Sequence, residues 1–179
     1  GPDRKLYIVI GDNGRRGWLQ NLPCGPTATC PGPTVTDDQF GGPAPDNPHL
    51  SGDVLRLDAD GSAPSDNPFF SNANVNAKKV FSFGHRNSYG FTFHGHTSHL
   101  WETENGPGDN DEINRIVSGG NYGWPTVGGI AGNPNFSDPI LAYTPTIAPT
   151  GIISIPENST DYPVAYRNNL LFVDFNGGK

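Results

Sequence analysis

VFSFGHRNSYGFTF, residues 80–93, and LWETENGPGDNDEINRIVSGGNYGWP, residues 100–125, decide how this chain is interpreted. Short apolar and β-branched runs alternate with corners rich in glycine, asparagine, aspartate and proline, a pattern typical of antiparallel strands joined by tight turns. The corners also carry a guanidinium, several amides and carboxylates, the groups that bind anions and hard cations. The stretch therefore predicts a β fold with a ligand site on its turns.

The remaining sequence favours the same all-β class. Among 179 residues there are 24 glycines, 18 prolines and no methionine, so turn formers are abundant and strong helix formers are sparse. Repeated short strands with polar corners fit a propeller or a sandwich. No shift in composition divides the chain, so residues 1–179 are interpreted as belonging to one domain. The expected strands are Leu6–Ile10, Asp53–Asp58, Lys79–Phe83, Gly90–Phe93, His99–Thr103, Glu112–Ile116, Gly151–Ile155 and Leu170–Asp174.

Charge and hydropathy exclude two classes of partner. The formal net charge is −7 and no basic stripe is present, which argues against a nucleic-acid partner. No apolar run approaches the roughly 18 residues that a membrane helix needs, so the chain is not expected to span a membrane.

Two cysteines, Cys24 and Cys30, enclose a five-residue loop in CGPTATC. A local disulfide suits an exported protein and is the favoured interpretation, while two free thiols remain the alternative. Zinc binding is disfavoured because no second Cys or His pair stands at a matching spacing.

The corners resemble those of the soluble quinoprotein sugar dehydrogenases, the glucose/sorbosone (aldose sugar) dehydrogenase family that uses pyrroloquinoline quinone (PQQ). The resemblance implies a six-bladed β-propeller, of which this chain covers roughly the middle three blades, with both ends cut within the domain. The remainder of the propeller or a partner chain would then complete it, because an open propeller exposes a sheet edge. The matching segments are LYIVIGDNG (6–14), GDVLRLDADGSAPSDNPF (52–69), FGHRNSYGFTF (83–93), TENGPGDNDEINRIVSGGNYGWP (103–125) and TPTIAPTGI (144–152).

The resemblance implies catalytic and cofactor-binding residues. Asp12 matches the aspartate that orients the catalytic histidine, and that histidine is expected upstream of this chain. Arg86 and Asn87 match an Arg-Asn pair that contacts PQQ, with Arg86 also expected to stabilise charge on the reduced quinone. Thr146 matches a further cofactor contact.

The resemblance also implies two calcium sites. Gly106 and Pro107 match the pair whose carbonyl groups bind the calcium ion that touches PQQ. Glu112 and Tyr122 match ligands of a second, structural calcium ion. Asp109 and Asp111 have the alternative interpretation of a solvated acidic corner.

The implied activity is oxidation of the anomeric carbon of an aldose sugar to a lactone. PQQ is the hydride acceptor, calcium the Lewis acid, and an external electron acceptor reoxidises the quinone. The expected location is periplasmic or extracellular, as for a secreted protein. Asn176 falls at or near a lysine of the family that pairs with PQQ, which leaves open a non-catalytic extracellular propeller that binds a protein or carbohydrate partner. A calcium-stabilised structural module is a third interpretation.

Overall fold

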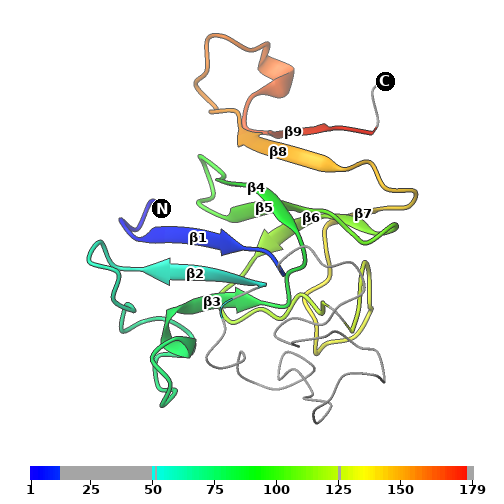
Figure 1. The fold of residues 1–179 in the computed structure, drawn as a ribbon. Coiled ribbons are helices and arrows are strands. Elements are labelled where there is room, and N and C mark those ends of the chain that lie inside the picture. Colours follow the sequence, from blue (N-terminus) through cyan, green and yellow to red (C-terminus); the bar gives the residue numbers. More distant parts are fainter. Residues whose placement is uncertain (13–49, 51, 125, 177–179) are drawn as a thin grey trace.

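The computed structural model describes residues 1–12, 50, 52–124 and 126–176 (Figure 1). Their strands form three open antiparallel sheets with the orders β1-β2-β3, β4-β5-β6-β7 and β8-β9. Two short 3-10 helices, η1 (Ala77–Lys79) and η2 (Val164–Tyr166), lie in connections. The strands are β1 (Leu6–Ile10), β2 (Asp53–Leu57), β3 (Val80–Phe83), β4 (Ser88–Phe93), β5 (Leu100–Glu104), β6 (Asp111–Ile116), β7 (Leu141–Tyr143), β8 (Pro149–Ser154) and β9 (Leu170–Asp174).

The sequence predicted eight of these strands to within two residues at each end, which confirms the all-β expectation. It missed β7, which pairs with β6 through Asp111↔Tyr143, Glu112↔Ala142 and Ile113↔Leu141. Three residues are too few for an alternating pattern to appear, so only tertiary pairing identifies this strand.

All five residues of strand β2 are buried, including a charged one. Arg56 is only 7% exposed. Its Nε donates to Asp3 at 2.9 Å, and its Nη1 donates to Asp66 at 2.8 Å and to Asn67 at 3.0 Å. These acceptors neutralise and satisfy the guanidinium, so the charged position can face inward.

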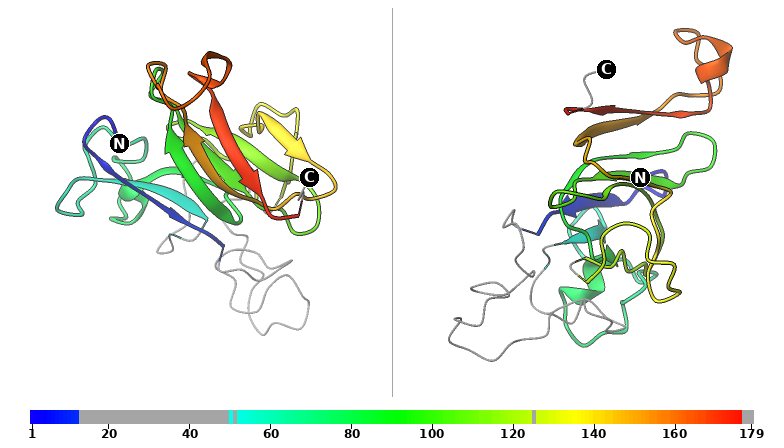
Figure 2. Two further views of the ribbon diagram at one scale, coloured as in Figure 1. Left: turned by 90° about the horizontal axis from the view of Figure 1, so that it is seen from above. Right: turned by 90° about the vertical axis from the view of Figure 1, so that its right-hand side faces the viewer.

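The three sheets are stacked as layers, with the four-stranded sheet between the other two (Figure 2). Apolar side chains from the first two layers form one core cluster: Val54, Leu100, Ile116 and Tyr122, with Tyr7, Val9, Phe81 and Phe93 packed against it. A second cluster lies within the first layer and includes Leu55, Val80 and Phe83. Burial of such side chains provides the main stabilisation of the stack.

Gly90 on β4 lets the third layer approach the second closely. A Cβ atom at Gly90 would lie 3.1 Å from the Cα of Gly151 and 3.2 Å from the carbonyl oxygen of Thr150. The backbones of β4 and β8 therefore meet at two glycines, which fixes where β8 packs.

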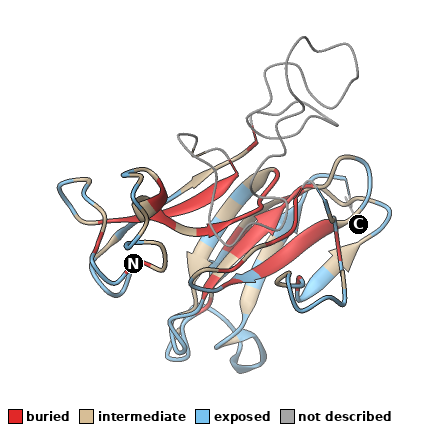
Figure 3. Ribbon diagram, turned by 90° about the horizontal axis from the view of Figure 1, so that it is seen from below, coloured by how far each residue is buried: buried red, intermediate tan, exposed pale blue. Residues whose placement is uncertain are grey.

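Most residues of β2, β3, β5 and β6 are buried, whereas β1, β4, β7 and β9 contain none in that class (Figure 3). Large apolar side chains are exposed on β1 and on the third sheet with its flanking residues: Leu6, Ile8, Ile153, Leu171, Val173 and Phe175. No helix of the described residues has the length and apolar character of a membrane span.

Candidate functional site

A pocket of about 500 Å³ opens among the loops that follow β3, β5, β7 and β9. It gathers residues from widely separated segments, with amide, hydroxyl and backbone groups among aromatic and apolar walls. This volume lies within the range of roughly 300–1,000 Å³ usual for small-molecule sites. Its walls include Asn87, Tyr89, Asn105, Gly106, Pro107, Thr146, Phe175 and Asn176.

One buried carboxylate holds two walls of this pocket. Asp111 is 1% exposed. Its Oδ1 accepts a hydrogen bond from the Gly106 N–H at 2.8 Å, and its Oδ2 accepts from the N–H groups of Ile147 and Ala148 at 2.7 and 2.6 Å. The interpretation of Asp111 as a solvated acidic residue is therefore wrong, whereas Asp109 is exposed.

The turn at Gly106 has no room for a side chain. A Cβ atom there would lie 1.8 Å from the Asp109 carbonyl oxygen and 2.8 Å from that of Asn110. The neighbouring atoms are backbone and cannot rotate away. Only glycine fits this corner, and Pro107 follows it on the pocket wall.

Asp12 and Arg86 form a second group beside the pocket rather than part of its lining. The N–H of Asp12 donates to the Arg86 carbonyl at 2.7 Å, and Trp124 Nε1 donates to Asp12 Oδ2 at 3.0 Å. The Arg86 guanidinium lies over the Trp124 ring, 5.3 Å from its centroid. Arg86 Nη1 also donates to the Asn105 carbonyl, which connects this group to the pocket wall.

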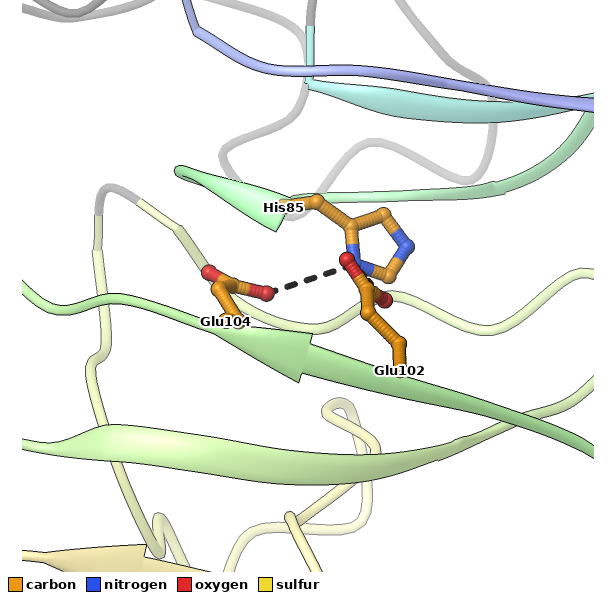
Figure 4. Close-up of side chains that lie close together, drawn as sticks. All are labelled: His85, Glu102 and Glu104. Carbon is orange, nitrogen blue, oxygen red and sulfur yellow. Dashed lines mark ion pairs between the residues drawn. The ribbon is translucent and has the colours of Figure 1, made fainter. Parts of the chain in front are cut away.

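His85 lies behind Arg86, between the end of β3 and strand β5 (Figure 4). Its Nδ1 is 3.1 Å from Glu102 Oε2 and 3.4 Å from Glu104 Oε2, and its Nε2 is 2.8 Å from Ser82 Oγ. Burial alone would lower the pKa of His85, but the two carboxylates outweigh it and raise this pKa to about 10.

Glu112 and Tyr122, the expected ligands of a second calcium ion, are both buried. Glu112 accepts hydrogen bonds from Gly129 N–H and from Asn114 Nδ2, the latter at 3.1 Å. Burial and the nearby Glu104 carboxylate raise the pKa of Glu112 to about 8. The Tyr122 hydroxyl donates to the Arg115 carbonyl at 2.6 Å, and its ring stacks on His85 with centroids 4.6 Å apart.

The predicted residues thus fall into separate places. Asn87, Gly106, Pro107 and Thr146 line one pocket together with Asn176, while Asp12 and Arg86 lie beside it, and Glu112 and Tyr122 are buried away from its lining. Cys24 and Cys30 lie outside the described residues.

Sequence reasoning missed three structural roles. The first is the hydrogen bond that the indole N–H of Trp124 donates to Asp12. Asp111 had no assigned role in the pocket. The pairing of His85 with Glu102 and Glu104 was also missed, although residues two apart on a strand share one face, and this spacing was the available signal.

Comparisons with known proteins identify one family that matches nearly the whole chain. The family model described as Glucose / Sorbosone dehydrogenase matches residues 1–175. Quinoprotein glucose dehydrogenase B of Acinetobacter calcoaceticus is 40% identical over 129 residues, which cover 72% of this chain and 25% of that protein. Aldose sugar dehydrogenase YliI of Escherichia coli is 40% identical over 120 residues, covering 67% of this chain and 25% of that protein.

Solved structures are similar over most of the chain. The PQQ-bound aldose sugar dehydrogenase of Streptomyces coelicolor has a TM-score of 0.62 at 31% identity, covering 87% of this chain and 37% of its own. The apo-form of the soluble aldose sugar dehydrogenase of Escherichia coli has a TM-score of 0.69 at 26% identity, covering 95% and 44%. The chain spans about a quarter of the length of the two curated relatives described above. With a family model matched from residue 1 to residue 175, the chain belongs to the glucose/sorbosone dehydrogenase family.

Proposed function

We propose that this chain forms the PQQ- and calcium-binding part of a sugar dehydrogenase that oxidises the anomeric carbon of an aldose to a lactone. One observation carries the proposal: Asn87, the Gly106-Pro107 pair and Thr146, which are far apart in sequence, line a single pocket. The family relationship supports an oxidoreductase acting on sugars.

The donors and acceptors of the pocket fit a polar, anionic quinone. Asn87 supplies an amide and Thr146 a hydroxyl, while Tyr89 and Phe175 provide aromatic walls. Within the described part of the chain, Arg86 Nε and Asn105 Oδ1 are buried without hydrogen-bond partners. Unpaired buried polar atoms are costly, and a bound polar ligand would satisfy them.

Each residue has a distinct part in this proposal. Gly106 and Pro107 offer carbonyl oxygens to calcium, and the hydrogen bond from Gly106 N–H to Asp111 holds that turn in place. Asn87 and Thr146 donate to the ligand, while the Arg86 guanidinium favours negative charge near Asn87. Bound PQQ would supply the hydride acceptor, with calcium as Lewis acid.

Asp12 has the positioning role in the proposed reaction. Trp124 fixes its carboxylate through the 3.0 Å hydrogen bond. A carboxylate held in this way would orient an imidazole and favour its protonated form, and the catalytic histidine would come from outside this chain. The proposal further includes a structural calcium ion held by the Glu112 carboxylate and the Tyr122 carbonyl.

The rest of the proposed protein is a six-bladed propeller in which this chain provides roughly the middle three blades of one domain. The apolar side chains exposed on β1 and β9 support this, because further blades would cover them. A periplasmic or extracellular location and an external electron acceptor belong to the same proposal.

A titration of the intact protein with PQQ, with and without calcium and followed by absorbance, tests the proposal. Saturable binding that EDTA reverses is expected, and Thr146→Val should weaken it while Thr97→Val, at an exposed turn, should not. Sugars would then be screened with an electron-accepting dye.

The alternative, a partner-binding propeller, is favoured by Asn176, an amide on the pocket wall at or near the family's lysine position. Absence of PQQ binding in folded protein would select that alternative.

A further inference from the structure

Three metal-ligating groups converge behind the pocket. His85 Nδ1, one oxygen of Glu102 and one oxygen of Glu104 all lie within 4.8 Å of one another. His85 and Glu102 are 0% exposed and Glu104 is 5% exposed. The three side chains come from the segment after β3 and from β5, so the cluster joins the first two layers (Figure 4).

The two distances from His85 Nδ1 to the carboxylate oxygens suit a small cation. With metal–ligand bonds of about 2.0–2.1 Å, the edges of a tetrahedral zinc site are about 3.3 Å long. Nδ1 lies 3.1 Å from Glu102 Oε2 and 3.4 Å from Glu104 Oε2. Nε2 faces Ser82 Oγ at 2.8 Å, the outer hydrogen bond that fixes a ligating imidazole with Nδ1 toward the metal.

Buried oxygens at the cluster lack other partners. Within the described residues, neither oxygen of Glu102 has a hydrogen-bond partner, although Oε2 lies at ion-pair distance from Nδ1. The contact therefore has the distance of an ion pair without the directionality of a hydrogen bond. Asn114, also 0% exposed, donates from Nδ2 to Glu104 and Glu112 but has an unpartnered Oδ1.

Charge gives a second, independent argument. Glu102 and Glu104 place two carboxyl groups in one buried region around a single imidazole. Buried carboxylates are stable when they are paired, protonated or bound to a metal. A divalent cation between them would offset this charge more completely than His85 alone.

We propose that His85, Glu102 and Glu104 bind a divalent transition-metal ion, with zinc as the best fit, at a structural site separate from the ligand pocket. The imidazole favours zinc over calcium, which takes oxygen ligands. Asn114 Oδ1 or the second Glu102 oxygen, both without hydrogen-bond partners among the described residues, would complete the coordination. The site braces Arg86, whose backbone N–H donates to Glu104 Oε1 at 2.7 Å.

The test uses the intact protein, stripped with chelator and then titrated with zinc chloride in excess calcium, so that oxygen-only sites are already filled. One tightly bound zinc ion per chain is expected by calorimetry and elemental analysis. Glu102→Gln should weaken zinc binding at least about tenfold, since it removes one charged ligand. Glu157→Gln is the matched control, because Glu157 pairs with His96 at 3.4 Å on the exposed surface.

Cobalt substitution covers the case in which Glu102→Gln does not fold. X-ray absorption of the cobalt-loaded wild type should show a four-coordinate nitrogen and oxygen shell containing one imidazole. No saturable zinc binding in excess calcium, equal binding by folded Glu102→Gln, or an all-oxygen cobalt shell would each overturn the assignment. PQQ binding is measured separately in the presence of calcium alone, so failure of the proposed function is distinguishable.

Discussion

Asp111 holds Gly106 in place through a 2.8 Å hydrogen bond from the glycine N–H to Oδ1, while Oδ2 accepts from the N–H groups of Ile147 and Ala148. One carboxylate thus ties together two backbone segments of the pocket wall. The geometry of the site depends on a residue with no assigned part in ligand binding.

Asp111→Asn should damage this pocket. An amide has one acceptor oxygen, so its NH₂ group must face at least one of the backbone donors. Loss of a charge-assisted hydrogen bond costs about 1.5–3 kcal/mol, and we expect a fall in unfolding free energy of that size together with weaker ligand binding. Urea denaturation and PQQ titration measure the two effects. Asp109→Asn, on the exposed side of the same turn, should change neither the unfolding free energy nor PQQ binding. An equal loss in that variant would contradict the role of Asp111 in holding the two segments together.

Gly106→Ala should remove calcium-dependent ligand binding. The added Cβ would meet the Asp109 carbonyl oxygen at 1.8 Å, so the turn must move and carry its own carbonyl with it. Isothermal calorimetry with calcium and PQQ measures the loss. Gly128→Ala is the control, because its Cβ would have its nearest contact at an ordinary 3.8 Å. Unchanged calcium affinity in Gly106→Ala would contradict the assigned role of this turn.

Trp124→Phe should remove the hydrogen bond from the indole N–H to the Asp12 carboxylate while keeping an aromatic ring beneath Arg86. The lost hydrogen bond to a buried carboxylate should lower the unfolding free energy by about 1.5–3 kcal/mol. Trp101→Phe is the contrasting variant, since Trp101 Nε1 is buried without a hydrogen-bond partner among the described residues. Its replacement should be close to neutral. Thermal melts of both variants measure the two losses of stability. Equal destabilisation would show that the loss in Trp124→Phe comes from the smaller ring and not from the missing hydrogen bond.

The ion pair of Asp3 and Arg56 should make stability depend on pH. Burial raises the pKa of Asp3, but hydrogen bonds from Arg56, the Lys5 N–H and Tyr7 outweigh it and hold this pKa below its usual range. Because its pKa is lower in the folded than in the unfolded protein, the Asp3 carboxylate stabilises the fold at pH values above its unfolded pKa of about 4. This stabilisation is lost as the pH falls through the folded pKa.

Asp3→Asn should therefore cost at most about 1 kcal/mol at neutral pH, because Asp3 is partly exposed. The difference from wild type should shrink below about pH 4, where the unfolded aspartate is protonated. Denaturant melts at several pH values measure this difference in unfolding free energy. Asp161→Asn, at an exposed position, is the control. A difference that persists unchanged at low pH would exclude an ionic origin.

Much of the fold was predictable because its strands carry local signals. Alternation around Leu55 and Phe91, with glycine and asparagine at the corners, identifies strands without tertiary information. β7 and the full burial of Arg56 were not predictable, since each depends on partners distant in sequence. Arg56 is buried because Asp3, 53 residues away, meets its guanidinium.

The site was predictable only in part for a similar reason. The resemblance identified Asn87, Gly106 and Thr146, and the structure places them in one pocket. It did not reveal that Trp124 donates to Asp12 across 112 positions. Side-chain partners of this kind follow from how the sheets stack, and a strand pattern does not encode them.

The alternation along β5 has a consequence for how this chain reaches its fold. Leu100, Glu102 and Glu104 share one face of the strand, and Trp101 and Thr103 share the other. A slip of one residue during pairing would turn both carboxylates away from His85 and present an indole in their place. The misaligned hairpin would then bury unpaired charge, so the cluster disfavours a shifted register of β5 against β6.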